Sequence, residues 1–167
     1  MRLFHSDYEA ATCRLAIDNL SDCRLLATRM ASQIRTPLAI ALSGTLGAGK
    51  TQWTRFFAIA LHAQPQSISS PTFMLVHEYN SQPPIFHLDA YRIGDEEEML
   101  ELGLEEMLDA DAVTIIEWAD RFPRLLPRNT LYMHFEVGEI PEARTVHMRA
   151  TGERAKCLLA FVANSVQ

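Results

Sequence analysis

The chain has 167 residues, a length typical of one domain, and its 48% hydrophobic and 22% charged residues are ordinary values for a globular protein. Acidic residues outnumber basic ones 21 to 15, and the resulting formal charge of −6 disfavours a protein that binds nucleic acid on its own. The sequence has no apolar run long enough to cross a bilayer and no secretory signal, so we expect a cytoplasmic protein.

The cysteines and lysines are few. Three cysteines (Cys13, Cys23 and Cys157) are an odd number without CxxC spacing, which predicts neither a disulfide framework nor a zinc site. Only two of the 15 basic residues are lysines, Lys50 and Lys156. A lysine that falls inside a motif is therefore informative.

Residues 8–35 are predicted to contain a helix, because Leu26, Met30 and Ile34 recur at four-residue spacing. Ser21-Asp22 is the predicted N-cap of this helix. We divide the chain into an N-terminal extension of unknown role, residues 1–18, and a single domain, residues 19–167.

The middle of the chain alternates short apolar runs with turns. Residues 38–42 are a continuous apolar run that predicts a strand buried on both faces. A glycine-rich turn over 44–49 follows, and helical spacing resumes over 50–63. Two further strands are predicted over 72–79 and 85–91.

The C-terminal part begins with an acidic stretch, residues 95–106, which predicts a solvated amphipathic helix or a helix pair interrupted at Gly103. Residues 112–116 predict a second fully apolar strand. An antiparallel hairpin and a closing helix are predicted over 130–137, 145–150 and 154–164.

One sequence motif by itself predicts a phosphate-binding loop. It has the form G-x-x-x-x-G-K-[ST] and lies between a predicted strand and a predicted helix: Gly44, Thr45, Leu46, Gly47, Ala48, Gly49, Lys50 and Thr51. Glycines let the backbone N–H groups form a nest for phosphate oxygens, and the helix N-terminus adds a positive dipole end. Lys50 is then placed to reach the β- and γ-phosphates, and the Thr51 hydroxyl to bind Mg²⁺.

Two carboxylates complete the candidate site. Asp89 and Glu117 each end an apolar strand, where ligands gather in open α/β sheets, and such a carboxylate holds Mg²⁺ or its water shell in P-loop proteins. A structural salt bridge is the alternative for each, and the sequence does not divide the two roles. The Thr72 hydroxyl is either a sensor of nucleotide state or part of a simple turn.

Four side chains near these motifs have ordinary structural explanations. His87 has no second histidine or cysteine at metal-ligand spacing, so we expect a structural histidine. Arg92, Arg121 and Arg124 are each able to serve as an arginine finger, but surface salt bridges are the default for arginine.

Four segments together resemble a known family. They read LSGTLGAGKT over 42–51, SSPTFMLVHEY over 69–79, HLDAYR over 87–92 and IIEW over 115–118. In this order and spacing they are similar to the TsaE family, the small bacterial ATPases of tRNA threonylcarbamoyladenosine biosynthesis. The resemblance covers the chain from about residue 20 to about residue 150.

The resemblance implies an α/β fold with a P-loop NTPase-like sheet, helices on both faces and a C-terminal antiparallel hairpin. It implies ATP and Mg²⁺ as cofactors and TsaD and TsaB as partners, with tRNA reached indirectly through the complex. ATP hydrolysis would reset or activate that complex rather than transfer the threonylcarbamoyl group.

Residue roles follow from the resemblance at matching positions. Thr51 and Glu117 would serve Mg²⁺, Asp89 would be a second catalytic carboxylate, Thr72 a nucleotide sensor and Trp118 a functional neighbour. The chain departs from the family where Thr45 replaces the usual Asp and Ala90 the commoner Leu. A small-molecule P-loop kinase is the alternative function, although the longest helical insertion is acidic rather than arginine-rich.

Overall fold

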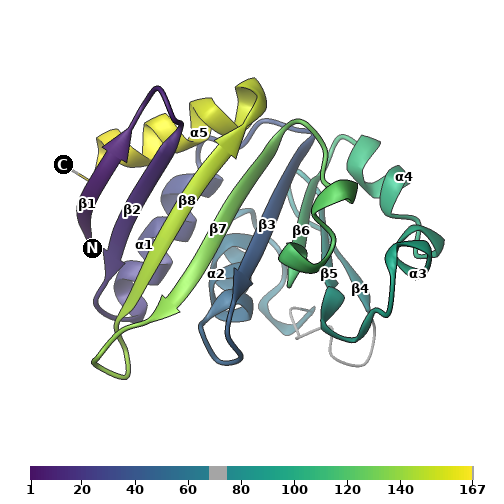
Figure 1. The fold of residues 1–167 in the computed structure, drawn as a ribbon. Helices are drawn as coiled ribbons and strands as arrows, with labels where there is room; N and C mark the ends of the chain where they lie inside the picture. The colour runs from purple at the N-terminus through teal and green to yellow at the C-terminus, as the bar shows by residue number, and fades with distance from the viewer. Residues whose placement is uncertain (68–74, 167) are drawn as a thin grey trace.

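The computed structural model describes residues 1–67 and 75–166, and eight strands in these ranges form one sheet in the order β1-β2-β8-β7-β3-β6-β5-β4 (Figure 1). The strands are β1 Arg2–Asp7, β2 Thr12–Ile17, β3 Leu38–Gly44, β4 Val76–Tyr79, β5 Ile85–Asp89, β6 Val113–Glu117, β7 Thr130–Val137 and β8 Arg144–Thr151. The helices are α1 Leu20–Ala31, α2 Lys50–Ala60, α3 Glu96–Glu101, α4 Leu104–Asp109 and α5 Gly152–Ser165. None of the helices in the described ranges is long and apolar enough to cross a bilayer.

The strands β3, β6 and β5 form the parallel part of the sheet. β3 pairs in parallel with β6, and β6 pairs in parallel with β5. Ile40 on β3 is packed in the larger core cluster, whereas its neighbour Ala41 belongs to a second cluster on the opposite face. This burial on both faces confirms the strand predicted from the continuous apolar run.

The strands β7, β8, β2 and β1 form an antiparallel part, which joins β3 through a parallel β3–β7 pairing. The β7–β8 hairpin confirms the prediction from period-two alternation. Residues 1–18, for which the sequence suggested no role, contribute β1 and β2 to the same sheet.

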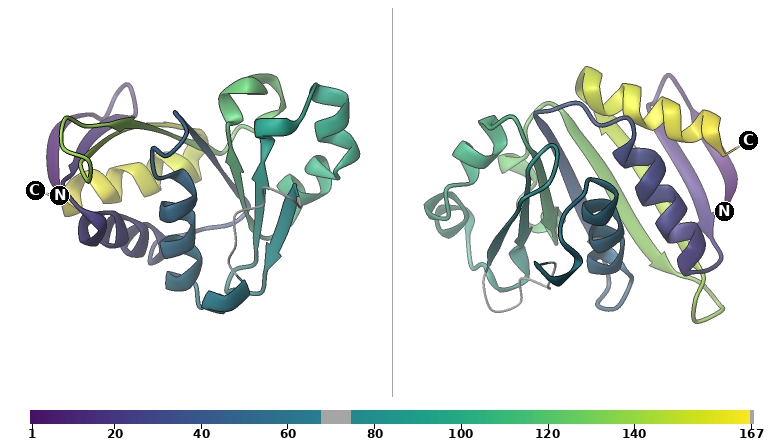
Figure 2. Two further views of the ribbon diagram at one scale, coloured as in Figure 1. Left: turned by 90° about the horizontal axis from the view of Figure 1, so that it is seen from below. Right: turned by 180° about the vertical axis from the view of Figure 1, so that it is seen from behind.

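The two faces of the sheet are covered unequally. Figure 2 shows α1, α2 and α5 together on one face, over the larger core cluster. On the other face α3, α4 and the turns after β6 pack against the parallel strands, with Met99, Leu104 and Phe122 buried. In the described part of the chain no helix covers this second face over β1, β2 and β8. Helices on both faces are therefore confirmed, but one half of the sheet has an open face.

The helical material predicted within residues 8–35 is confirmed in the C-terminal part of that range. Residues 12–17 are the strand β2, and α1 begins only at Leu20. The predicted N-cap at Ser21-Asp22 is wrong, because Asn19 is the N-cap and its side chain accepts a hydrogen bond from the Asp22 N–H. β2 buries Leu15 and Ile17 and exposes Arg14, an alternation typical of a strand and not of the 3.6-residue period of a helix.

Other element boundaries differ by a few residues. The strand predicted over 85–91 ends at Asp89, where a 3-10 turn over Ala90–Arg92 begins. The helix predicted over 50–63 ends at Ala60. The acidic pair α3 and α4 is confirmed, and Gly103 separates them with a φ of 80°, a left-handed conformation that favours glycine.

Candidate functional site

The P-loop follows β3 and has the backbone conformation that its glycines permit. Gly44, Gly47 and Gly49 have φ values of 127°, 77° and 106°. A Cβ on Gly44 would lie 2.3 Å from the carbonyl oxygen of Phe135, so only glycine fits where the loop leaves the sheet. The loop therefore turns sharply into α2, which begins at Lys50 with Gly49 as N-cap.

Lys50 is folded back onto the loop that precedes it. Its side chain is buried, and Nζ donates hydrogen bonds to the carbonyl oxygens of Gly44 at 2.8 Å and Thr45 at 3.0 Å. Nζ also lies 3.9 Å from the ring centroid of Trp118, a cation–π contact. The ammonium group is thus held at the mouth of the phosphate nest.

The electrostatic environment of Lys50 is that of a partly buried cation among carboxylates. Burial lowers the pKa of the Lys50 ammonium below its ordinary value, while the negative charges of Glu117, Asp89 and Asp120 oppose this change. Two of these carboxylates end strands of the sheet, and Asp120 lies in the turn after β6.

A chain of hydrogen bonds holds Glu117 in place. Thr51 Oγ1 donates to Glu117 Oε2 at 2.9 Å, and the other carboxylate oxygen, Oε1, lies 2.9 Å from His87 Nε2. Tyr79 Oη lies 2.8 Å from His87 Nδ1. Glu117 is 2% exposed and His87 is fully buried, so both oxygens of the carboxylate have a fixed partner.

The contacts of His87 define a direction of donation. Glu117 as a carboxylate only accepts, so His87 Nε2–H donates to it and Nδ1 accepts from the Tyr79 hydroxyl. Burial, together with the negative charge of Glu117, raises the pKa of Tyr79 to about 12, which keeps this hydroxyl a donor. His87 is a satisfied buried histidine, as expected, but it also orients the candidate carboxylate.

Asp89 lies next to Glu117 because the parallel register of β5 and β6 pairs these two residues. Its Oδ1 accepts a hydrogen bond from the Tyr91 N–H at 3.0 Å and so caps the following 3-10 turn. Its Oδ2 has no hydrogen-bond partner among the described residues. Asp89 thus combines a structural contact with one oxygen that is available to a ligand.

Arg144 is a site residue that the sequence analysis missed. Its Nε donates to the carbonyl oxygen of Ala48 at 2.8 Å and its Nη2 to that of Gly47 at 3.2 Å. Arg144 belongs to β8, 94 positions after the P-loop lysine, and no sequence motif links the two. The guanidinium fixes the outward-facing carbonyls of the loop, which leaves the N–H groups to face the nest.

A cavity of about 280 Å³ lies beside the P-loop. Its wall includes Leu20 and Phe135 as apolar groups and Asn19 as a polar one, along with Gly47 and Gly49 of the loop. Apolar walls with a few polar groups are typical of sites for a planar base.

The remaining predicted residues have different surroundings. Thr72 lies outside the described residues. Arg121 donates to the carbonyl oxygens of Ala90 and Tyr91, each at 2.6 Å, so its guanidinium is engaged in a backbone contact. Trp118 has a left-handed φ of 60° and its ring packs on Tyr91 at a centroid distance of 5.0 Å.

The donor set fits a magnesium ion bound with a phosphate ligand. A hydroxyl and a carboxylate, Thr51 and Glu117, already share a hydrogen bond, and oxygen ligands of this kind suit Mg²⁺. No three His, Cys, Asp or Glu side chains gather into a metal cluster in the described ranges. An ion held here would take its other ligands from phosphate oxygens and water.

The site as a whole combines a phosphate nest, a lysine, a hydroxyl–carboxylate pair, a second carboxylate and a neighbouring cavity. This set supports the binding of a nucleoside triphosphate and the attack of water on its terminal phosphate.

Comparison with protein families gives a match over most of the chain. Residues 17–146 match the family described as "Threonylcarbamoyl adenosine biosynthesis protein TsaE". The chain is 33% identical over 141 residues to a Bacillus subtilis protein named "tRNA threonylcarbamoyladenosine biosynthesis protein TsaE", covering 84% of this chain and 87% of that one. A Streptomyces coelicolor protein of the same name is 36% identical over 138 residues, which cover 78% and 92% of the two chains.

The fold has a counterpart among solved structures. A crystal structure of Bacillus subtilis YdiB superposes with a TM-score of 0.76 at 25% identity, over 93% of this chain and 97% of that one. The eight-stranded mixed sheet is therefore similar to that of an experimentally determined protein.

Proposed function

The chain belongs to the TsaE family of tRNA threonylcarbamoyladenosine biosynthesis proteins, and on this premise we propose that it is the ATP-binding and ATP-hydrolysing component of that machinery. In this role it resets or activates the TsaD–TsaB complex that modifies adenosine 37 of tRNA. The observation that carries the proposal is the contact between Thr51 and Glu117, which joins the P-loop to the end of a neighbouring strand.

The P-loop residues bind the nucleotide. Lys50 exchanges its hydrogen bonds to the Gly44 and Thr45 carbonyls for phosphate oxygens, which are stronger, charged acceptors. The backbone N–H groups of Gly47 and Gly49 face the phosphates, supported from behind by Arg144. The adenine base occupies the cavity beside Leu20 and Phe135.

The two carboxylates, Glu117 and Asp89, serve the hydrolysis step rather than nucleotide binding. Mg²⁺ bound to Thr51 and Glu117 would supply positive charge to the phosphate oxygens as charge develops in the transition state. His87 donates to Glu117 and thereby fixes the carboxylate that faces Thr51. Asp89 has a free Oδ2 and is the group we assign to orienting the attacking water.

The contacts of Arg121 support dependence on partner proteins. Arg121 is bound to backbone carbonyls, so its guanidinium is not free to stabilise the transition state. An arginine supplied in trans is worth about 10³ to 10⁵ in rate. We therefore propose slow hydrolysis by the chain alone and fast hydrolysis with TsaD and TsaB together.

The test is a measurement of phosphate release by the chain alone, with TsaD, with TsaB and with both. We expect substantial turnover only in the complete mixture, and a lower rate there with Trp118→Ala, because the ring packs on Lys50. Equal rates in every mixture would contradict partner dependence. Phosphorylation of a small metabolite by the chain alone would favour the alternative function, a small-molecule kinase.

A further inference from the structure

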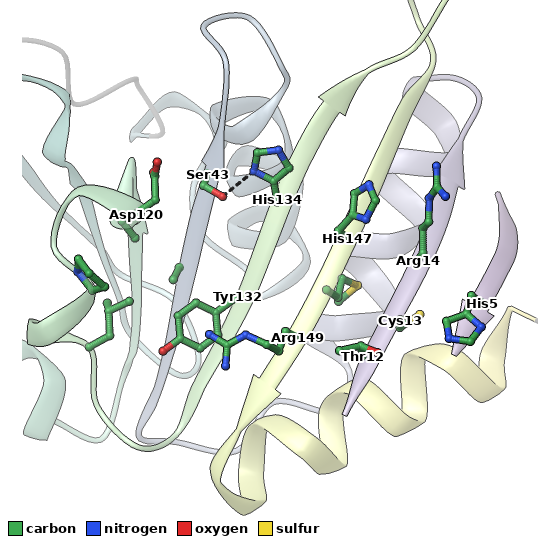
Figure 3. A pocket seen from close by; sticks show the side chains of 15 residues that line it. His5, Thr12, Cys13, Arg14, Ser43, Asp120, Tyr132, His134, His147 and Arg149 are labelled. Carbon is green, nitrogen blue, oxygen red and sulfur yellow. Dashed lines mark hydrogen bonds between the residues drawn. The ribbon is translucent and has the colours of Figure 1, made fainter. Parts of the chain in front are cut away.

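A cavity of about 720 Å³ lies over the open face of the sheet, and its lining differs from that of the cavity beside the P-loop (Figure 3). Its floor is the face of β2, β8 and β7 that no helix covers, and Ala119, Pro123 and Leu126 form an apolar wall along one side. Nothing in the proposed ATPase mechanism uses this face.

A row of basic and polar side chains crosses the floor of this cavity. The row runs in register across five neighbouring strands: His5 on β1, Arg14 on β2, His147 on β8, His134 on β7 and Ser43 on β3. Strands are spaced by about 4.8 Å, so the row is about 19 Å long. Ser43 Oγ lies 2.9 Å from His134 Nδ1, as the dashed line in Figure 3 marks.

A second row lies one pleat away and adds an aromatic platform. Arg149 and Tyr132 are register partners, and the guanidinium lies 3.9 Å from the ring centroid. Arg149 is exposed and, among the described residues, forms no salt bridge. An arginine stacked on an aromatic ring keeps its N–H groups free for phosphate while the pair presents a flat surface.

The negative net charge of the chain is located elsewhere. Residues 95–109 hold eight of the 21 acidic residues and no lysine or arginine, and they form α3 and α4 beside the parallel strands. The rest of the chain has 13 acidic against 15 basic residues. The fold therefore separates the acidic residues 95–109, which carry a charge of −8, from a remainder of the chain in which basic residues slightly outnumber acidic ones.

Two carboxylates, Glu136 and Asp120, lie at or beside the cavity, and neither is paired with the arginines proposed to bind an anionic ligand. Glu136 Oε2 lies 2.9 Å from His147 Nε2 and thus has a cationic or donor partner. Asp120 stands on the opposite wall, within the electrostatic reach of Lys50. Arg14, His134 and Arg149 have no carboxylate within salt-bridge distance among the described residues.

We propose that this open sheet face binds a segment of single-stranded RNA, with phosphates along the Arg14 row and a base against the Arg149–Tyr132 pair. Sheets that expose basic and aromatic side chains are a general platform for single strands. The choice of RNA over another polyanion rests on the proposed role in tRNA modification. The contact adds a direct RNA surface to a protein for which the family resemblance implied only indirect contact with tRNA.

The experiment measures binding of a fluorescent single-stranded RNA of about 12 nucleotides, without ATP, by fluorescence anisotropy across a salt series. We expect the double variant Arg14→Ala/Arg149→Ala to bind at least tenfold more weakly. The slope of log K against log salt should fall by about 1.4, because two phosphate contacts are lost. The exposed Arg55→Ala on α2, a matched arginine on the other face, should bind like the parent chain.

Three further binding measurements separate a loss of RNA contacts from a fold defect, from an effect of the ATP site and from binding of any polyanion. Arg14→Lys/Arg149→Lys should recover most of the salt-dependent affinity, which a fold defect would not allow. Lys50→Ala should keep full RNA affinity while losing ATP, so that failure of the ATPase proposal and failure of this one are distinguishable. An oligo-glutamate peptide of matched charge should bind at least tenfold more weakly than the RNA.

Three results would overturn the proposal. They are equal RNA affinity of the parent chain and the Arg14/Arg149 double alanine variant, loss of RNA binding with Lys50→Ala, and peptide affinity equal to that of the RNA. The last result would assign the face to an acidic protein segment instead.

Discussion

The two halves of the sheet differ in what their polar residues do. In the parallel half, β3, β6 and β5 are covered on both faces, and the few polar side chains there, such as His87 and Glu117, are buried and paired. In the antiparallel half, one face packs on α1 and α5, and the other exposes Arg14, His134 and Arg149. One half thus concentrates a few fixed groups at strand ends, whereas the other spreads charged groups over a surface.

The two halves therefore suit different functions, because one fixes individual buried groups and the other presents many exposed groups together. The buried half fixes atoms to within a hydrogen bond, as catalysis requires. The open half offers repeated, solvent-exposed cations, which suit binding of an extended anion. Substitutions in the two halves should therefore have separable effects.

The largest expected effect separates the two lysines. Lys50→Ala removes the buried ammonium at the P-loop and should abolish ATP binding measured by isothermal titration calorimetry. Lys156, the second lysine, is exposed on α5 in the antiparallel half, and Lys156→Ala should bind ATP normally. Unchanged ATP affinity in a folded Lys50→Ala variant would contradict the nucleotide site.

The next effect concerns hydrolysis without loss of binding. Glu117→Gln and Asp89→Asn should bind ATP but hydrolyse it about 10² to 10³-fold more slowly in the presence of both partners. Asn at position 89 keeps an oxygen for the Tyr91 N–H, so the turn after β5 should persist. The exposed Glu153→Gln on α5 serves as the control, and normal turnover in both site variants would reduce Asp89 and Glu117 to structural residues.

A smaller effect tests the junction between the halves, where β3 meets β7. Gly44→Ala places a Cβ 2.3 Å from the Phe135 carbonyl oxygen at a φ of 127°, and should destabilise the fold by about 3 kcal/mol. Gly47→Ala meets no atom within 4 Å and should cost about 1 kcal/mol, from its φ of 77° alone. Urea denaturation measures both, and equal losses would contradict the close approach.

The smallest effect is on the open face and depends on pH. The hydrogen bond from His147 lowers the pKa of the exposed Glu136 carboxyl in the folded state. Its stabilising contribution is therefore present above the ordinary pKa of 4.5 and is lost as pH falls through the lowered value. Glu136→Gln should lower Tm slightly at pH 7, by less than Gly47→Ala, and the difference should vanish in acid. A Tm difference that grows in acid would have the wrong sign.

The sequence by itself determined the apolar strands of the parallel half, the P-loop between strand and helix, and the β7–β8 hairpin. Apolar runs over 38–42 and 112–116 predict strands buried on both faces, and the motif ending in Lys50-Thr51 predicts a phosphate loop between strand and helix. These features are local, because residues adjacent in the chain make the nest and the strand. The resemblance to a family followed from the same local segments.

Only the tertiary structure decided the rest. The pairing of Thr51 with Glu117, the orientation of Glu117 by His87 and the contact of Arg144 with the P-loop each join segments far apart in the chain. Strand register places such groups together, and register depends on packing of the whole sheet rather than on any one segment. The same reason explains why β2 was not predicted: its six residues become a strand by pairing with β8. That pairing also places Arg14 beside His147 in the basic row.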